Sequence, residues 1–87
     1  MLSNKSLDAV SSQVAVLLKE EREKRGISLN VLAQKAGLSR QTISYVEQQV
    51  QNPTLDTLLR LSFAMEIELA DLIKRASQTV DAANTRV

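Results

Sequence analysis

Between residues 39 and 48, side chains that can form paired hydrogen bonds recur at the spacing of an α-helix. Ile43 and Val46 form an apolar edge. The opposite side of the predicted helix carries Arg40, Gln41, Ser44 and Tyr45. Arginine can bind guanine O6 and N7, glutamine can bind adenine in the same two-point manner, and serine can contact either base. A tyrosine could reach a phosphate or a thymine methyl group. This side lacks any acid, so it is a candidate for contact with DNA, although many exposed helices carry such residues.

A second predicted helix precedes this one and meets it at a sharp corner. Apolar residues recur there at helical spacing: Leu32, Ala33 and Ala36. Gly37 interrupts the pattern, and glycine adopts a left-handed conformation without a Cβ clash, so the chain can turn within a few residues. Ser39 stands where it can cap the next helix. The stretch Leu29–Val46 therefore predicts a helix-turn-helix.

The composition narrows the classes of function. The chain has 87 residues, which suits one small domain. It has no cysteine and no histidine, which excludes the usual zinc and haem sites, disulfides, and thiol or histidine catalysis. We expect no metal, no cofactor and no enzymatic activity. The net charge of +1 gives no general attraction to nucleic acid, and no apolar run approaches a signal peptide or a membrane span, so we expect a cytoplasmic protein.

The rest of the chain predicts further helices and no strand. Residues 1–9 are mostly polar and predict a flexible arm, and an amphipathic helix follows from about residue 10 to residue 25. Thr54 can cap a fourth helix that runs to about residue 65, and residues 69–76 carry the apolar stripe of a fifth. The helical domain is thus expected over residues 10–76. The polar tail at residues 77–87 leaves two alternatives open, an extended helix or a disordered segment.

The stretch from Leu17 to Ile73 resembles the phage repressor and Cro-like helix-turn-helix family, also called the XRE type. The resemblance rests on residues in the family's order and spacing: Arg22, Gly26, Leu32-Ala33, Gly37-Leu38-Ser39, Thr42-Ile43-Ser44, Glu47, Asn52-Pro53-Thr54-Leu55 and Leu69-Ala70-Asp71-Leu72-Ile73. It implies an all-α, compact five-helix bundle with the lambda repressor-like fold, and double-stranded DNA as the partner.

The resemblance also implies roles for single residues. Base contacts are implied for Arg40, Gln41 and Tyr45, to which the polar side of the helix adds Ser44. Phosphate contacts are implied for Ser39, Thr42, Asn52 and Thr54, and we add Gln48 from the end of the same polar side. Helix starts support phosphate contacts independently, because their unpaired N–H groups and partial positive charge favour an anion. The alternative is that Ser39 and Thr54 are caps and that Asn52 is a turn residue, with or without DNA.

Two residues depart from the family's pattern. Leu29 stands where many members have a glutamine that holds a phosphate and braces the recognition helix, and leucine can do neither. Glu66 stands where a glycine often ends the fourth helix, and a left-handed Glu66 would cost about 1 kcal/mol. We therefore expect this corner to differ.

Arg22 and Glu47 lie far apart in sequence, yet each continues the apolar side of its predicted helix. Two partly buried opposite charges are expected to pair. Such a pair could fix helix 39–48 for DNA binding, and the alternative that we favour is a structural salt bridge.

The predicted fourth helix is apolar over a wider arc than one core-facing stripe requires. We expect a homodimer contact through Leu59, Phe63 and Ile67. The alternative is that the N-terminal arm covers this surface through Leu2 or Leu7.

Together these features predict a sequence-specific transcriptional regulator. We expect a repressor that binds a palindromic operator as a dimer, with helix 39–48 in the major groove. The alternative is an antitoxin or adaptor-type module, in which Val50, Phe63 and the C-terminal tail bind another protein and DNA binding is secondary.

Overall fold

The computed structural model describes residues 4–85, and the side chains of residues 6–83. Within this range the chain forms five α-helices and no strand, in agreement with the predicted all-α class. They are α1 (Asn4–Lys24), α2 (Leu29–Ala36), α3 (Arg40–Glu47), α4 (Leu55–Ala64) and α5 (Leu69–Thr85). None of these helices is long and apolar enough to cross a lipid bilayer.

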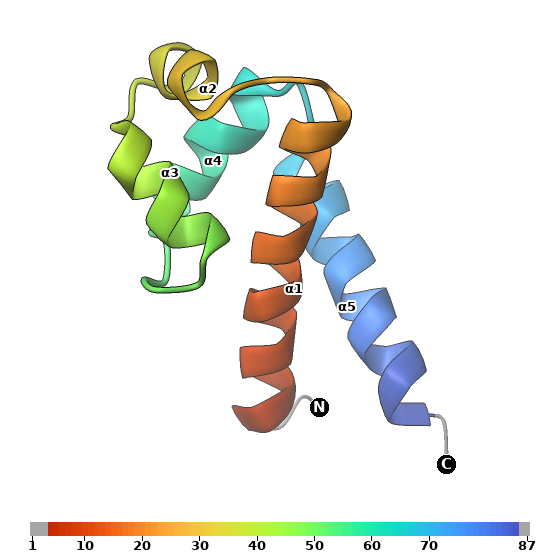
Figure 1. The fold of residues 1–87 in the computed structure, drawn as a ribbon. Coiled ribbons are helices and arrows are strands. Elements are labelled where there is room, and N and C mark those ends of the chain that lie inside the picture. The colour runs from red at the N-terminus through yellow and green to blue at the C-terminus, as the bar shows by residue number, and fades with distance from the viewer. Residues whose placement is uncertain (1–3, 86–87) are drawn as a thin grey trace.

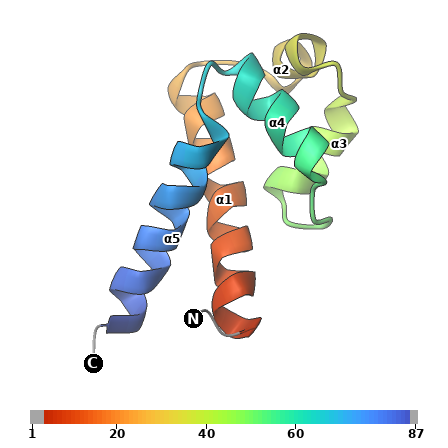
Figure 2. The same cartoon turned by 180° about the vertical axis from the view of Figure 1, so that it is seen from behind.

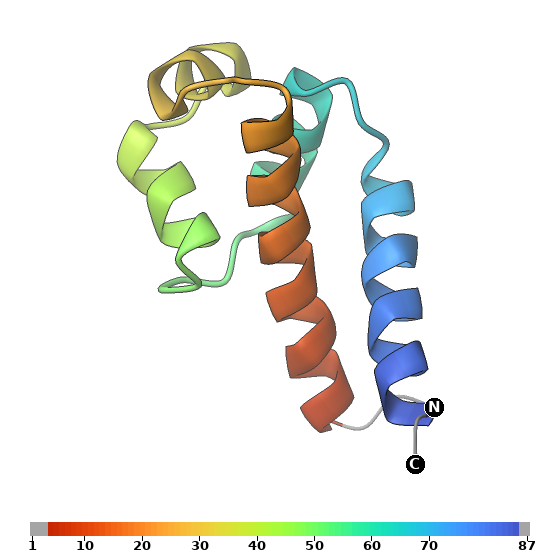
Figure 3. The same ribbon diagram turned by 45° about the vertical axis from the view of Figure 1, so that its right-hand side comes forward.

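The two long helices, α1 and α5, lie side by side and run in opposite directions (Figure 1). The start of α1 and the end of α5 therefore lie at the same end of the molecule. The three short helices gather at the other end, beside the second half of α1, as the view from behind also shows (Figure 2). Figures 1 and 3 agree that α3 forms the edge of the molecule on the side away from α5. The arrangement leaves one face of α3 without a neighbouring helix.

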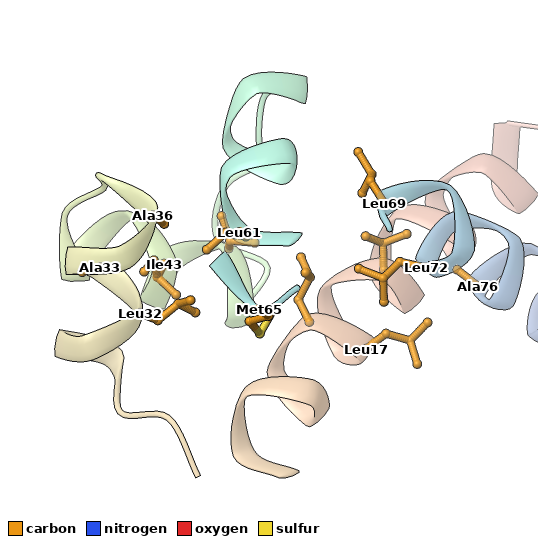
Figure 4. Close-up of a cluster of buried hydrophobic side chains, with 13 residues drawn as sticks. Leu17, Leu32, Ala33, Ala36, Ile43, Leu61, Met65, Leu69, Leu72 and Ala76 are labelled. Atoms are coloured by element: carbon orange, nitrogen blue, oxygen red, sulfur yellow. The ribbon is translucent and has the colours of Figure 1, made fainter. Parts of the chain in front are cut away.

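One apolar core joins all five helices (Figure 4). Its most deeply buried side chains come from α2, α3, α4 and α5: Leu32, Ile43, Leu61, Leu72 and Ala76. Leu17 and Leu18 of α1 complete it. An isolated helix of eight residues is unstable in water, so α2 and α3 depend on this burial for their stability.

Each of the first four helices ends in the same tight turn, in which an N–H donates to the carbonyl oxygen five residues earlier. These hydrogen bonds join Ile27 to Arg22 (3.1 Å), Leu38 to Ala33 (3.0 Å), Val50 to Tyr45 (2.9 Å) and Ile67 to Ser62 (2.9 Å). The residue before each donor has a positive φ: 66° at Gly26, 68° at Gly37, 60° at Gln49 and 57° at Glu66. The corner after α4 thus keeps the left-handed turn despite the absence of glycine, so the expected difference there is wrong.

The structure corrects the predicted flexible arm over residues 1–9, because α1 begins at Asn4. Residues 1–3 lie outside the described part of the chain. At the other end, α5 runs to Thr85, well past residue 76, where the helical domain was expected to end. Of the two alternatives for the tail the helix is the one found, and residues 86–87 lie outside the description. Apolar side chains anchor both helices near these extensions, because Val10 of α1 packs on the core and Val80 of α5 is buried.

The helical start of α1 also removes one alternative for the apolar surface of α4. Leu7 belongs to the first turns of α1, at the end of the molecule opposite to the connection between α4 and α5 (Figures 1 and 3). It is therefore too far away to cover Phe63. Leu2, the other residue considered for this role, lies outside the described residues.

A buried acid fastens α5 to α1. Glu21 is only 7% exposed, and its carboxylate accepts a hydrogen bond of 3.2 Å from Nη1 of Arg75 and lies 3.4 Å from Nε of Arg25. Burial by itself raises the pKa of Glu21, but the hydrogen bond from Arg75 and the charges of Lys24, Arg75 and Arg25 outweigh it and lower this pKa. Glu21 therefore stays ionised and links the two long helices.

A second ion pair fastens α3 to α1, as the sequence analysis expected. Arg22 Nε donates to Glu47 Oε2 at 2.6 Å, and Arg22 Nη2 donates to Glu47 Oε1 at 3.0 Å. The third nitrogen, Nη1, donates to the carbonyl oxygen of Ile27 at 2.9 Å. Both side chains are largely buried, and the hydrogen bonds with Glu47 raise the pKa of Arg22. One guanidinium thus joins α1, the turn after it, and α3.

The left-handed Glu66 leads to a first prediction. Glu66→Gly should stabilise the protein by about 0.5–1 kcal/mol, because it removes the Cβ clash, although glycine also gives the unfolded chain more freedom. The melting temperature should rise by about 2–8 °C in a thermal unfolding scan. Glu66→Ala is the control, since it removes the same carboxylate and keeps the Cβ. Equal melting temperatures for the two variants would contradict the expectation.

The Arg22–Glu47 pair leads to a second prediction. Arg22→Met or Glu47→Leu alone should lower the free energy of unfolding by about 3 kcal/mol, because each leaves a largely buried charge without its partner. The double variant should lose less free energy of unfolding than either single variant, because it leaves no unpaired charge buried. Urea unfolding of the four proteins at pH 7 measures these differences. Losses that simply add in the double variant would show that the two residues do not act as a pair.

Candidate DNA-binding surface

The start of α3 is fixed by its cap and by the corner before it. Ser39 accepts a hydrogen bond of 3.0 Å from the backbone N–H of Thr42, and the two hydroxyl oxygens lie 2.7 Å apart. A Cβ at Gly37 would lie 3.2 Å from Nη1 of Arg60, so both space and backbone conformation favour glycine at this corner. Ile43 and Val46 are buried and turn the opposite side of α3 outward.

The outer side of α3 gathers the residues that were expected to contact bases. Arg40 and Gln41 are exposed, and Ser44 and Tyr45 are half-buried. Two hydrogen bonds connect these side chains along the helix. Gln41 Nε2 donates to the phenolic oxygen of Tyr45 at 2.6 Å, and Gln48 Nε2 donates to Ser44 Oγ at 2.8 Å. Gln48, which we expected to contact a phosphate, is thus part of the same polar row.

The outer side of α3 carries no carboxylate. The one acid of this helix is Glu47, whose side chain is 7% exposed and binds Arg22 on the inner side. A carboxylate on the outer side would repel the phosphates of DNA and would compete with them for Arg40. The ion pair therefore has a second consequence besides stability, since it keeps negative charge away from this surface.

The residues expected to contact phosphates lie at both ends of α3. Ser39 and Thr42 lie at its start, and Asn52 and Thr54 lie in the connection that leads from its end to α4 (Figure 2). Thr54 caps α4 by accepting a hydrogen bond of 3.1 Å from the N–H of Thr57. Two helix N-termini with free N–H groups thus flank the polar row, which is the arrangement that suits anions on either side of it.

The structure places Leu29 outside this surface. Leu29 is half-buried and packs against the core, so it is part of the support for α2. The sequence analysis missed the two hydrogen-bonded pairs on α3. Their spacing was the available signal, because residues four apart lie next to each other on a helix. Among the described residues, no group of three acids or other ligands could hold a metal ion.

A second surface of interest covers the outer side of α4. Leu55, Leu59 and Phe63 follow each other at intervals of four residues and are 65%, 50% and 84% exposed. At the end of this row, a shallow groove is lined by Phe63, by half-buried Ile67 and by residues at the start of α5. We call Leu55, Leu59, Phe63 and Ile67 the α4 apolar surface.

Known proteins share this architecture. A family model described as helix-turn-helix matches residues 18–72. The crystal structure of the restriction-modification controller protein C.AhdI from Aeromonas hydrophila matches with a TM-score of 0.66 and 32% identity, over 72% of this chain and 94% of that one. The crystal structure of SinR, the master regulator for biofilm formation, in complex with DNA matches with a TM-score of 0.64 and 30% identity, over 69% of this chain and 97% of that one.

Sequence relatives are longer than the part that matches. SinR from Bacillus subtilis, an HTH-type transcriptional regulator, is 30% identical over 63 residues, which are 71% of this chain and 57% of SinR. A protein of Methanocaldococcus jannaschii is 42% identical over 53 residues, which are 61% of this chain and 17% of that protein. The chain thus spans between about a sixth and somewhat over half of these relatives. On its fold and its match over residues 18–72, it belongs to the XRE/Cro-lambda repressor-like family of helix-turn-helix DNA-binding proteins.

Proposed function

We propose that this protein is a transcriptional repressor that binds a palindromic operator as a dimer, with α3 in the major groove. The observation that carries the proposal is the polar outer side of α3, whose only acid is turned inward to Arg22. The SinR structure, which was solved with DNA, supports this use of the fold. Such a regulator would act in the cytoplasm, on the DNA of a bacterium or a phage.

The geometry suggests how the surface would work on a duplex. Arg40 and Gln41, in the first turn of α3, would reach base edges, and Ser44 and Tyr45 would follow one turn later. Phosphates on the two sides of the groove would bind at the starts of α3 and α4, where Ser39, Thr42, Asn52 and Thr54 lie. Phosphate contacts fix the register of the helix, and base contacts then select the sequence. Occupation of the operator would block access by RNA polymerase.

The dimer would form through the α4 apolar surface, with Leu59, Phe63 and Ile67 as its expected contacts. A phenylalanine that is 84% exposed next to two exposed leucines is unfavourable in water, and a second copy would cover all three. Leu7 is not available to cover this surface, because it belongs to the first turns of α1, at the opposite end of the molecule. A dimer would also place two copies of α3 on successive major-groove faces of a palindromic site, about 34 Å apart.

The second candidate function is an antitoxin or adaptor that binds another protein. It is favoured by Val50 and Phe63, which are 61% and 84% exposed. The tail that was expected to serve such a partner is part of α5; Val80 is buried, whereas the described side chains at 78, 79 and 81–83 are exposed. In this candidate, binding of the other protein is the main activity and DNA binding is secondary.

A selection from random oligonucleotides tests the proposed function, and Arg40→Ala tests the site. The parent should enrich a palindromic sequence, and Arg40→Ala should lose about 1–3 kcal/mol of discrimination at one base pair in each half, with unchanged stability. Lys74→Ala is the control, because it removes an exposed positive charge from α5, on the other side of the molecule. If Arg40→Ala selects and binds the same site as well as the parent, the assignment of α3 is wrong.

Leu59→Lys tests the dimer. It places like charges opposite each other in the proposed contact and should weaken self-association at least about tenfold, which equals about 1.4 kcal/mol. Leu7→Lys is a matched control, because Leu7 is also 50% exposed but lies on α1. Sedimentation equilibrium measures both variants. A parent that is monomeric at high micromolar concentration would remove the dimer from the proposal.

A further inference from the structure

Two side chains on the outer side of α3 hold each other. Gln41 and Tyr45 lie one helical turn apart, and Gln41 Nε2 donates to the phenolic oxygen of Tyr45 at 2.6 Å. Gln41 is exposed, whereas Tyr45 is half-buried, so the tyrosine ring is partly seated in the protein. Tyr45 is the less exposed partner of the pair, so we take it as the one that restrains the amide of the glutamine.

This hydrogen bond determines which groups of Gln41 can meet a base. A glutamine amide has two N–H donors and one carbonyl oxygen. One N–H is used by Tyr45. When this is the N–H that points away from the carbonyl oxygen, the other N–H and the carbonyl oxygen remain side by side. Adenine presents the complementary pair in the major groove, the N7 acceptor and the N6 amino donor. The restrained amide therefore matches adenine at two points.

The same restraint works against guanine. Guanine presents two acceptors in the major groove, N7 and O6. A restrained Gln41 would direct its carbonyl oxygen at O6, with no hydrogen between the two oxygens. An unrestrained amide could turn and direct both of its N–H groups at these acceptors. The hydrogen bond in the direction found here, with Gln41 as donor, thus excludes the orientation that would accept guanine, which would require the Tyr45 hydroxyl to donate to the Gln41 carbonyl oxygen instead.

We propose that Tyr45 fixes the amide of Gln41 so that Gln41 reads adenine and rejects guanine. Tyr45 is a positioning residue in this role. The phenolic hydrogen of Tyr45 is not used by Gln41, so it can still donate to a phosphate or to a neighbouring base. The inference rests on the proposed function, because it requires α3 in the major groove.

The experiment uses the full chain and the DNA site that the parent selects. Single base-pair replacements in this site identify the base pair at which the Gln41→Ala variant binds all replacements with equal affinity. There the parent should prefer A·T to G·C by about 5- to 150-fold. Tyr45→Phe keeps the ring and removes the hydroxyl, and it should lose most of this preference while it still binds the site. In the Gln41→Ala background, Tyr45→Phe should change the preference no further, because the two residues act as one unit.

A second pair on the same helix offers a matched control. Gln48 Nε2 donates to Ser44 Oγ at 2.8 Å, with the same spacing of four residues. Ser44→Ala releases Gln48 as Tyr45→Phe releases Gln41. It also removes an expected base contact, so overall binding should weaken, but the ratio of A·T to G·C binding at the Gln41 base pair should stay unchanged. Equal melting temperatures of the variants show that the fold is intact, and a merely structural role of Tyr45 would not change the preference at one base pair.

A modified base tests the inference with the parent protein alone. 7-Deazaadenine lacks the N7 acceptor, so its use at the Gln41 base pair should weaken binding by the parent about fivefold or more and leave Gln41→Ala unaffected. Three results overturn the inference: a preference for guanine at this pair, an unchanged preference in Tyr45→Phe, or parent binding that does not respond to 7-deazaadenine. If recognition requires Arg40 and one of these results is found, the inference alone fails. If the parent selects no site, the proposed function fails with it.

Discussion

The contact between Arg22 and Glu47 is the interaction on which the position of α3, and with it the candidate DNA-binding surface, depends. It joins α1 to α3 by two hydrogen bonds, and the same guanidinium holds the turn at Ile27. Because the pair is largely buried, each charge needs the other, and α3 has little freedom to rotate about its axis. The contact also takes the only acid of α3 to the inner side. One interaction thus sets both the orientation of α3 and the charge of its outer side.

The two sides of α3 have separate tasks. An isolated helix of eight residues does not persist in water, so its stability comes from Ile43 and Val46, which are almost completely buried, and from Glu47. On the outer side, Arg40 and Gln41 are exposed and contribute little to folding. Side chains at these positions can therefore be of a type that suits a particular DNA sequence, and the hydrogen bond between Gln41 and Tyr45 is a feature of this chain within the shared fold.

The helix-turn-helix could be predicted from the sequence because its boundaries have local causes. Gly37 adopts the left-handed conformation that the corner requires, and Ser39 and Thr54 cap the helices that follow. The turns at Gln49 and Glu66 have the same conformation but lack glycine, so no residue type marks them. There the packing of the connected helices imposes the turn. The residues at these positions do not favour it, because a left-handed conformation is unfavourable for any residue with a Cβ.

The ends of the molecule were harder to predict, for a related reason. Residues 4–9 and 77–85 are largely polar and lack strong periodicity, so each segment by itself favours no structure. They belong to α1 and α5, two helices that pack against each other and so join the two ends of the chain, a contact that neither segment shows by itself. The exposure of Phe63, by contrast, followed from its place on a helix with more apolar residues than the core could take. The dimer inferred from it stays a prediction.

Local charge, and not the net charge of +1, governs how this surface can meet DNA. Residues 39–55 contain one basic residue, Arg40, and one acidic residue, Glu47, whose charge is compensated by Arg22. Charges farther apart than about 8 Å are largely screened at physiological salt, so most other ionic groups of the chain add little here. With few cations to neutralise phosphates, non-specific attraction is weak. Affinity then has to come from uncharged donors at the helix starts, from base contacts and from two linked copies. These contributions to affinity are the ones that depend most on the base sequence of the DNA.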